Sequence, residues 1–476
     1  GSITNNGTLS VNGAASFAQL LVVDAVTLGG TGETVLADSA QSVIDGNNTG
    51  NTDVLTIAAA HTVRGGGRLG GLGTNDLKVI NQGTVRADAA SGMRVNVDDT
   101  GGAGFDNTGG TVEVADNSSL RLEAGTLKGG TLAGFGNGAL AGTGAGILSD
   151  VTLTGALQVA QNNAVGLTGS ITNNGTLSVN GAASFAQLLV VDAVTLGGTG
   201  ETVLADSAQS VIDGNNTGNT DVLTIAAAHT VRGGGRLGGL GTNDLKVINQ
   251  GTVRADAASG MRVNVEAADG FRNEGRVEVV NGSNMIFQAG SSLLQAGAAT
   301  AVTQVNGTLT SSLVDLQAGT LLGSGTVIGN VVNAAHVAPG NSAGVLTVTG
   351  AYTQALGGVL DIELGSLAEF DLLAVTGSAT LDGTLALHCL GACEFTVGDS
   401  VTILDATANN LVGEFFGLAL FGFATGGFEI VYDRLAGDVR LLVTEATSPS
   451  PVPLPGSAWL LLGGLGLLVR RGRHSA

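Results

Sequence analysis

The chain has 476 residues, of which 79 are glycine, while 12% are charged and only 3% are aromatic. Few side chains are large enough for a wide globular core, whereas the many small and β-branched ones suit a narrow core between short strands. The formal net charge of −20 excludes nucleic acid as a partner, and 43% hydrophobic residues exclude a disordered chain.

A long internal repeat organises the first part of the chain. Residues 1–97 recur without a change at 169–265, and we expect the offset between the two blocks to be a multiple of a shorter unit. Within and around each copy, variants of N-x-G-[TR]-[VL]-x-V return, as in "VINQGTVRA" and "FRNEGRVEV". They predict short strands, each entered through a turn that contains Asn and Gly.

These strands suit either a parallel solenoid or an array of β-sandwiches. An inserted block lengthens a solenoid, because each coil touches only its neighbours, whereas it would break the pairing of a closed sandwich. We therefore predict an all-β fold, a right-handed parallel β-helix over residues 1–360, with coils of roughly 20 residues. The repeated asparagines are interpreted as a stacked turn ladder that satisfies backbone groups.

The composition changes between residues 361 and 446, where seven of the 13 phenylalanines lie. Larger side chains predict a C-terminal β cap that covers the last apolar turn of the solenoid. This region also holds Cys389 and Cys393, which we expect to form a local disulfide in an oxidising compartment. Unpaired thiols and a metal or catalytic role remain as alternatives for the pair.

The segment 323–364, which contains "APGNSAGVLTVTG", is followed by "FDLLAVTGSATLDGTLAL" (370–387) and then by "GDSVTILDA" (398–406). This segment resembles the end of an autotransporter-type passenger. The resemblance implies the last coils of a β-helix followed by a capping region.

A proline-rich linker and sorting signature occupy residues 447–455, and four of the five prolines lie there. Residues 456–476 follow, with an uncharged run from Gly456 to Val469 and then a basic end. As a helix this run reaches only ~21 Å, so we predict a short and marginal transmembrane helix. Arg470, Arg471 and Arg473 place the C-terminus in the cytoplasm and the body across the membrane.

This tail resembles the PEP-CTERM sorting domain of Gram-negative bacteria. The match places Val452, Pro453, Leu454 and Pro455 at the recognition signature, with Leu454 where the family name has Glu. The resemblance implies a tail that is read by an exosortase, a membrane peptidase, in bacteria that often make exopolysaccharide.

Three further patterns bear on chemistry. "GGAGFDNTG" (101–109) is similar to a calcium-binding nonapeptide, but Thr108 stands at its apolar position and Arg272 replaces Asp106 in the second block. His61, His229 and His336 have no nucleophile motif beside them and are interpreted as rung or loop residues. The acidic residues are scattered, and those that the repeat duplicates include Asp45, Asp53 and Asp88. We therefore predict no catalytic residue, metal or cofactor.

The favoured function is an exported structural or adhesive protein of the cell surface or extracellular matrix, bound first to the membrane by its C-terminus. Its expected partners are the exosortase, the membrane, and exopolysaccharide or a host or cell surface. The alternative function is a surface-anchored β-helical enzyme, a lyase or hydrolase that acts on polysaccharide, which would need paired carboxylates on one external face.

Overall fold

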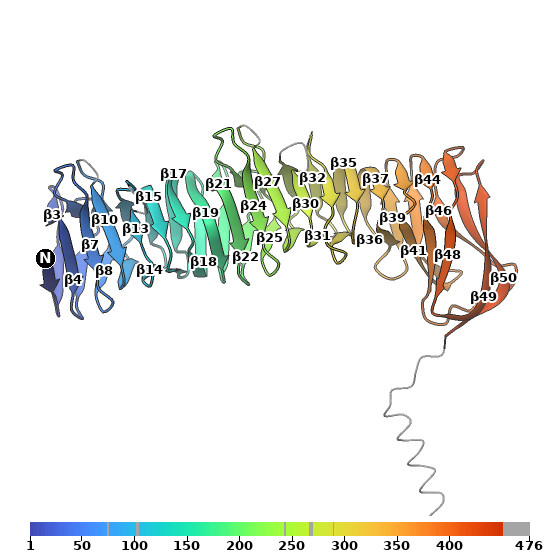
Figure 1. The fold of residues 1–476 in the computed structure, drawn as a ribbon, viewed down its shortest axis with the longest axis horizontal. Coiled ribbons are helices and arrows are strands. Elements are labelled where there is room, and N and C mark those ends of the chain that lie inside the picture. The colour runs from blue at the N-terminus through green and yellow to red at the C-terminus, as the bar shows by residue number, and fades with distance from the viewer. Residues whose placement is uncertain (74–75, 101–103, 242–243, 266–269, 289, 451–476) are drawn as a thin grey trace, which may run out of the picture.

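The computed structural model describes residues 1–73, 76–100, 104–241, 244–265, 270–288 and 290–450. Over these residues the chain forms strands and turns but no helix. The strands stack in parallel along one axis and form a rod with the N-terminus at one end (Figure 1). The predicted all-β parallel solenoid is therefore confirmed.

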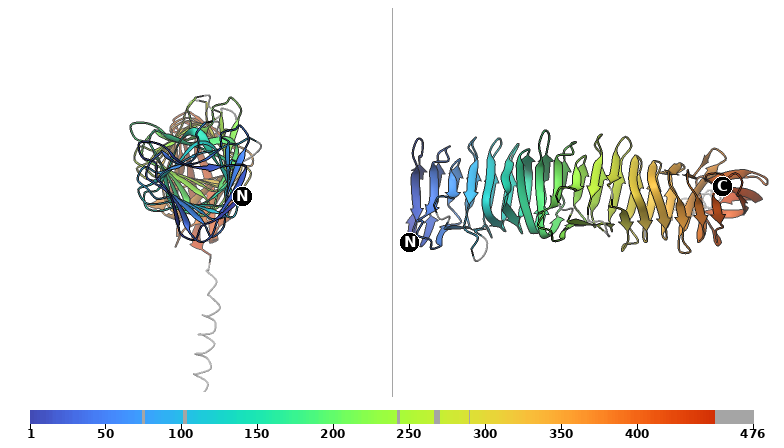
Figure 2. Two further views of the ribbon diagram at one scale, coloured as in Figure 1. Left: turned by 90° about the vertical axis from the view of Figure 1, so that its left-hand side faces the viewer. Right: turned by 90° about the horizontal axis from the view of Figure 1, so that it is seen from above.

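Three walls of hydrogen-bonded strands surround the axis, and Figure 2 shows the rod end-on and from above. The first wall contains β1 (Ser2–Thr4), β4 (Ala25–Gly29), β7 (Asp53–Ile57), β10 (Leu77–Asn81), β13 (Phe105–Asp106), the ends of β15 (Ser119–Lys128) and β17 (Ala139–Ser149), the starts of β19 (Asn163–Asn173) and β21 (Ala186–Gly197), β23 (Ser210–Gly214), β26 (Arg236–Gly238), β29 (Met261–Asn264), β32 (Asn284–Phe287), the starts of β35 (Thr308–Leu316) and β37 (Thr326–Asn333), β39 (Val345–Val348), β43 (Leu372–Val375) and β46 (Ser400–Asp405).

The second wall contains β2 (Thr8–Val11), β5 (Glu33–Leu36), β8 (Thr62–Gly65), β11 (Thr84–Ala87), β14 (Thr111–Val114), β16 (Thr131–Gly134), the start of β18 (Thr152–Ala160), the ends of β19 and β21, β24 (Asp221–Ile225), β27 (Leu245–Asn249), β30 (Phe271–Asn273), β33 (Leu293–Gln295), the ends of β35 and β37, β40 (Tyr352–Gln354), β44 (Ala379–Leu381) and β47 (Leu411–Gly413).

The third wall contains β3 (Ala18–Val22), β6 (Ser42–Gly46), β9 (Arg68–Gly70), β12 (Met93–Asn96), the starts of β15 and β17, the end of β18, β20 (Thr176–Asn180), β22 (Glu201–Leu204), β25 (Thr230–Gly233), β28 (Thr252–Ala255), β31 (Arg276–Val279), β34 (Val302–Val305), β36 (Thr320–Gly323), β38 (His336–Pro339), β41 (Val359–Ser366), β45 (Thr384–Cys389) and β48 (Gly417–Phe421). The walls share one apolar core, because alternate residues of each strand point inward.

The length of one turn varies along the rod. In one of the short turns, Thr320 is paired with His336 of the strand above it. In one of the long turns, Ala25 is paired with Val54, which is nearly twice as far along the chain. The prediction of roughly 20 residues per coil falls between these two cases, and the extra residues of the longer turns lie between the strands.

The N-x-G motif forms the corner between the first or second wall and the wall that follows. Asn273 shows the arrangement, since its side chain donates to Val302 O of the next turn at 3.0 Å and accepts from Gly275 N at 3.2 Å. Asn81 makes the same two contacts, with Thr111 O and Gly83 N. The predicted asparagine turn ladder is confirmed at these corners.

The two copies of the repeated block lie on different walls. β1 starts the first wall, but its copy at the end of β19 lies in the second wall, where Thr172 pairs with Thr152 of β18. β2 starts the second wall, but its copy β20 continues the third wall above the end of β18. The offset between the blocks is therefore not a whole number of turns, contrary to our expectation, because the intervening turns differ in length.

The pairing changes at the C-terminal end. Parallel stacking continues as far as β48, beyond the predicted boundary at residue 360. The last two long strands, β49 (Phe423–Asp433) and β50 (Asp438–Pro449), form an antiparallel hairpin, and β50 also pairs antiparallel with β46. A two-residue strand, β42 (Glu369–Phe370), folds back antiparallel on β41.

Candidate functional site

A polar pocket of ≈ 620 Å³ opens on the outside of the third wall, toward its C-terminal end. Its floor is made by outward side chains of β34, β36, β38, β41 and β45. The turn from Gly340 to Ser342 forms one side of it. Ser342 has a φ of 101°, which is unusual for a residue other than glycine and is typical of turns held by their surroundings.

Asp361 of the polar pocket lies between two imidazoles. Its Oδ2 is 2.8 Å from His336 Nδ1, and its Oδ1 is 3.0 Å from His388 Nε2. The three residues come from β38, β41 and β45, which are neighbours in the third wall. The His388 ring also stacks on Phe421, with the ring centroids 4.8 Å apart.

Two further carboxyl groups line the pocket. Asp371 is 2% exposed, and this burial raises the pKa of its carboxyl to about 7 although Glu363 N and Gly344 N donate to it. Glu363 follows Asp361 on the same face of β41, and its Oε2 is buried without a hydrogen-bond partner. The site thus joins three carboxyl groups with two histidines.

This arrangement can bind hydrogen-bond donors and can exchange protons near neutral pH. No short sequence motif indicates the polar pocket, because Asp361 is 25 positions from His336 and 27 positions from His388 in the chain. The sequence interpretation treats His336 as a rung or loop residue and the acidic residues as scattered, and the structure instead gathers them. The varying turn length hides which distant residues become neighbours.

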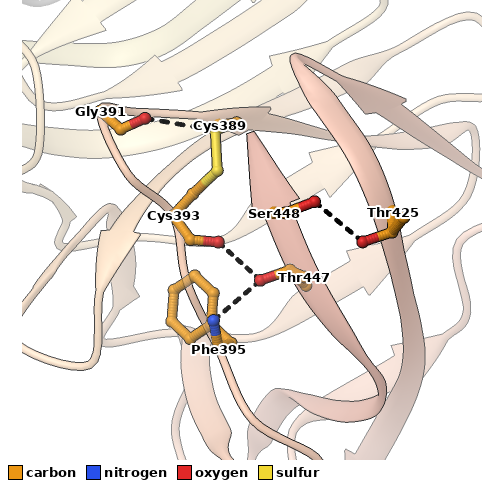
Figure 3. Close-up of a disulfide and its surroundings, with 7 residues drawn as sticks. All are labelled: Cys389, Gly391, Cys393, Phe395, Thr425, Thr447 and Ser448. Carbon is orange, nitrogen blue, oxygen red and sulfur yellow. Dashed lines mark hydrogen bonds between the residues drawn. A yellow bond between two sulfur atoms is a disulfide. The ribbon is translucent and has the colours of Figure 1, made fainter. Parts of the chain in front are cut away.

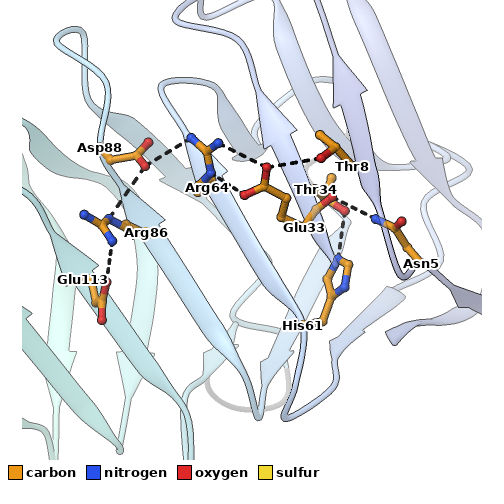
Figure 4. A network of polar contacts seen from close by, with 9 residues as sticks. All are labelled: Asn5, Thr8, Glu33, Thr34, His61, Arg64, Arg86, Asp88 and Glu113. Carbon is orange, nitrogen blue, oxygen red and sulfur yellow. Dashed lines mark hydrogen bonds and ion pairs between the residues drawn. The ribbon is translucent and has the colours of Figure 1, made fainter. Parts of the chain in front are cut away.

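A charged groove of ≈ 650 Å³ runs along the second wall in the first block (Figure 4). Arg64 Nε is 2.6 Å from Glu33 Oε2, and Arg64 Nη1 is 3.4 Å from Asp88 Oδ2. Arg86 Nη1 lies 3.6 Å from Glu113 Oε2 on the strand beyond. The hydrogen bond from Arg64 lowers the pKa of Glu33, so the first charged groove holds both signs of charge.

The second block repeats this groove on the third wall, with a volume of ≈ 530 Å³. Arg232 Nε is again 2.6 Å from Glu201 Oε2, and Arg254 Nη1 is 3.6 Å from Glu278 Oε2. The second charged groove lies on the same wall as the polar pocket. Both grooves also carry threonine hydroxyls, so each offers donors and acceptors to a polar ligand.

Cys389 and Cys393 form a disulfide in the structure, with their Cα atoms 5.5 Å apart (Figure 3). Thr447 of β50 fixes the loop after it, because its Oγ1 donates to Cys393 O at 2.5 Å and accepts from Phe395 N at 2.8 Å. The bridge thus fastens the end of β45 to the loop that the terminal hairpin holds.

The other singled-out residues have structural contacts. His229 is 1% exposed and lies 3.0 Å from Thr202 Oγ1, and desolvation lowers the pKa of its imidazole to about 4. His61 is bonded to Thr34 in the same way. In the nonapeptide-like segment, Asp106 Oδ1 accepts from Thr108 N at 2.9 Å and so closes a turn.

Three duplicated aspartates also have structural contacts. Asp53 accepts from Asp24 N and Asn47 N, both at 2.7 Å, and its copy Asp221 repeats these contacts in the second block. Asp45 accepts from Leu72 N at 3.1 Å, and Asp88 faces Arg64 in the first charged groove. Among the described residues, no group of three or more His, Cys, Asp and Glu side chains has the geometry to hold a metal ion.

The sorting signature Val452, Pro453, Leu454 and Pro455 lies outside the described residues, as do Arg470, Arg471 and Arg473. The described linker residues end at Ser450, whose N donates to Gly422 O at 2.7 Å. Within the described ranges, no helix has the length and apolar character needed to cross a bilayer.

No protein-family model matches the chain, and no curated protein is significantly similar to it. The resemblances to autotransporter passengers and to the PEP-CTERM sorting domain therefore stay predictions from the sequence.

Proposed function

We propose that the protein is an exported β-solenoid rod with a structural or adhesive role at the cell surface or in the extracellular matrix of a Gram-negative bacterium. The observation that carries this proposal is the faithful duplication of a whole block of the rod. Both copies stack without interruption, and both keep the same contacts, as in Arg64 with Glu33 and Arg232 with Glu201. Added length and a repeated surface are useful to a spacer or an adhesin.

The two charged grooves suit hydroxyl-rich partners such as exopolysaccharide or the glycans of a host or cell surface. Each groove holds arginine donors between carboxylate acceptors, so sugar hydroxyls find both kinds of partner. A polyanion would face Glu33, Asp88 and Glu113 in the first charged groove. The grooves lie on different walls, so one rod holds two such partners at once, which favours a matrix role.

The finer details of the fold belong to the same proposal. The solenoid is right-handed, because parallel crossover connections take this hand almost without exception. The β49–β50 hairpin serves as the C-terminal cap, and residues 456–476 supply a short transmembrane helix with a basic cytoplasmic end. An exosortase reads Val452 to Pro455 and processes the tail.

The tail is tested by two variants, expressed with a signal peptide in a host that has an exosortase. We expect Pro453→Ala with Pro455→Ala to insert normally and to block maturation, because the extended signature is lost. Exchange of Arg470, Arg471 and Arg473 for Glu should disturb retention and topology. The readouts are product size and membrane fraction, and normal maturation of the proline variant would refute the sorting role.

A second function, an enzyme that acts on polysaccharide, is favoured by one observation, the polar pocket. Asp361, Glu363 and Asp371 line it together, and the pKa of Asp371 is raised to about 7, so that one carboxyl holds a proton near neutral pH. A protonated carboxyl beside an ionised one is the acid and base pair of glycoside hydrolysis.

Reducing-end assays on acidic and neutral polysaccharides test this second function. If the pocket is catalytic, Asp361→Asn should lower the rate at least about 100-fold, because it removes one charge without changing the volume. Arg434→Gln, at the terminal hairpin and outside the pocket lining, is the control. Absence of bond cleavage by the wild-type chain would leave the structural function alone.

A further inference from the structure

The last turn of the solenoid leaves part of its core uncovered. Leu418 and Leu420 of β48 pair with Leu385 and Leu387 of β45, so all four point toward the core. The two leucines of β45 are 0% exposed, whereas Leu418 is 38% and Leu420 is 41% exposed. A solenoid is closed at its end by a cap, and here the cap does not reach the third wall.

The terminal hairpin lies on another side of the rod end. β50 pairs with β46 of the first wall, while the described residues contain no strand paired with the outer edge of β48. Figure 1 shows β48, β49 and β50 together at the end opposite the N-terminus. An open strand edge with exposed apolar side chains is a surface that natural proteins normally cover.

One neighbouring side chain enlarges this apolar surface. Phe416, just before β48, is 84% exposed, whereas Phe421 stacks on His388 on the outer face of the third wall. The segment 415–428 contains no charged residue and no proline. Glu414 and Arg434, joined at 2.7 Å, form a charged rim beside it. We call Phe416, Leu418 and Leu420 the apolar end.

The tail starts beside this surface. Ser450 N donates to Gly422 O, the residue directly after β48. Only the short segment 451–456 separates Ser450 from the apolar run that begins at residue 457. Even fully extended, the seven steps from Ser450 to residue 457 reach at most ~25 Å, so the start of that run stays close to the apolar end.

We propose that the apolar end seats on the interfacial layer of a lipid bilayer, so that the rod stands on the membrane instead of hanging from a free linker. The proposal rests on the membrane tail of the proposed function, which brings a bilayer within linker reach. Phe416, Leu418 and Leu420 enter the layer of acyl chains and headgroups, and Glu414 and Arg434 stay among the headgroups.

A second copy of the chain is a poorer occupant of this surface. Each chain carries a formal net charge of −20, so two copies that met end to end would repel each other. A zwitterionic bilayer does not repel the chain, and the linker to the membrane tail keeps the rod end close to the bilayer.

Tryptophan quenching by brominated lipid tests the seat, because the chain has one tryptophan, Trp459 of the tail. The probe is Phe416→Trp combined with Trp459→Phe in the full chain, reconstituted in vesicles of brominated phosphatidylcholine. We expect the lipid to quench at least half of the fluorescence of this probe. The control is Phe135→Trp with Trp459→Phe, at a half-exposed position in the middle of the rod, and it should lose less than a tenth.

The wild-type chain, in which only Trp459 reports, separates this proposal from the tail itself. Quenched Trp459 with an unquenched probe at position 416 would overturn the seat and keep the membrane tail. If lipid quenched the probe at position 416 but not Trp459, contact of the apolar end with the bilayer would stand and the membrane tail would be refuted. If lipid quenched neither tryptophan, both proposals would be refuted. An unquenched probe in a chain that sediments as a dimer would assign the surface to a second copy, and blue-shifted probe emission without lipid would assign it to the tail.

Discussion

Asn273 shows how one residue type holds neighbouring turns together. Its side chain donates to Val302 O and to Gln295 Oε1, both at 3.0 Å, and it accepts from Asn249 Nδ2 at 2.9 Å. The residue is 0% exposed, so none of these groups can turn to water instead. Such amide ladders let a glycine-rich chain turn corners without leaving backbone groups unpaired.

Replacement of Asn273 by Ala should therefore lower the local stability by about 1–3 kcal/mol, because Val302 O and Gly275 N lose their partners. Amide hydrogen exchange at β30, β33 and β34 measures this. Asn137→Ala, at an exposed turn, is the control and should change exchange by less than about 0.5 kcal/mol. Equal effects of the two substitutions would show that the ladder adds nothing.

Buried His229 predicts a pH dependence. The pKa of its imidazole is lowered to about 4 in the folded chain, below the ordinary value of 6.5. As the pH falls from 6.5 to 4, the unfolded chain takes up this proton and the folded chain does not, so stability falls by at most about 3 kcal/mol. Asp213, whose pKa burial raises to about 6, acts in the opposite direction.

The contribution of His229 is isolated by His229→Gln, which keeps a hydrogen-bonding side chain but cannot titrate. The free energy of unfolding of this variant minus that of the wild type should be larger at pH 4.5 than at pH 7.5. Denaturant unfolding at the two pH values gives the comparison. A difference between the two proteins that did not change with pH would contradict the buried neutral imidazole.

At the scale of elements, an N-x-G corner inside the rod needs its glycine because the preceding turn approaches closely, whereas the first corner has no preceding turn beside it. A Cβ atom on Gly83 would lie 2.3 Å from His61 O and 2.4 Å from Ala58 O. We expect Gly83→Ala to lower stability by about 1–3 kcal/mol through displaced backbone. Gly7→Ala is the matched control, since its Cβ would have no atom nearer than 4.0 Å. Thermal unfolding that is equally affected by both would refute the steric cause.

The corners could be predicted from the sequence because the motif that makes them is short. The neighbours across the polar pocket could not, because His336, Asp361 and His388 meet only after two complete turns of unequal length. For the same reason, the sequence does not predict that Glu33 and its copy Glu201 lie on different walls. A sequence shows the residues of a turn, but the lengths of all preceding turns decide which wall they reach.

At the scale of the whole molecule, the change of wall gives the rod two closely similar charged grooves that face in different directions. An offset of whole turns would have placed both grooves in one line, where a single long ligand could cover them. The observed arrangement instead presents them to separate ligands. The open apolar end and the polar pocket then distinguish the C-terminal end of the rod from its middle.

Small-angle X-ray scattering of the monomeric full chain tests the central claim, a single continuous rod. The eighteen described strands stacked in each wall, at ~4.8 Å from one to the next, give a body roughly 80 Å long. We therefore expect a skewed distance distribution with a long tail that reaches beyond about 80 Å. A symmetric distribution that ends near ~60 Å, as for a globule of this length, would contradict the account.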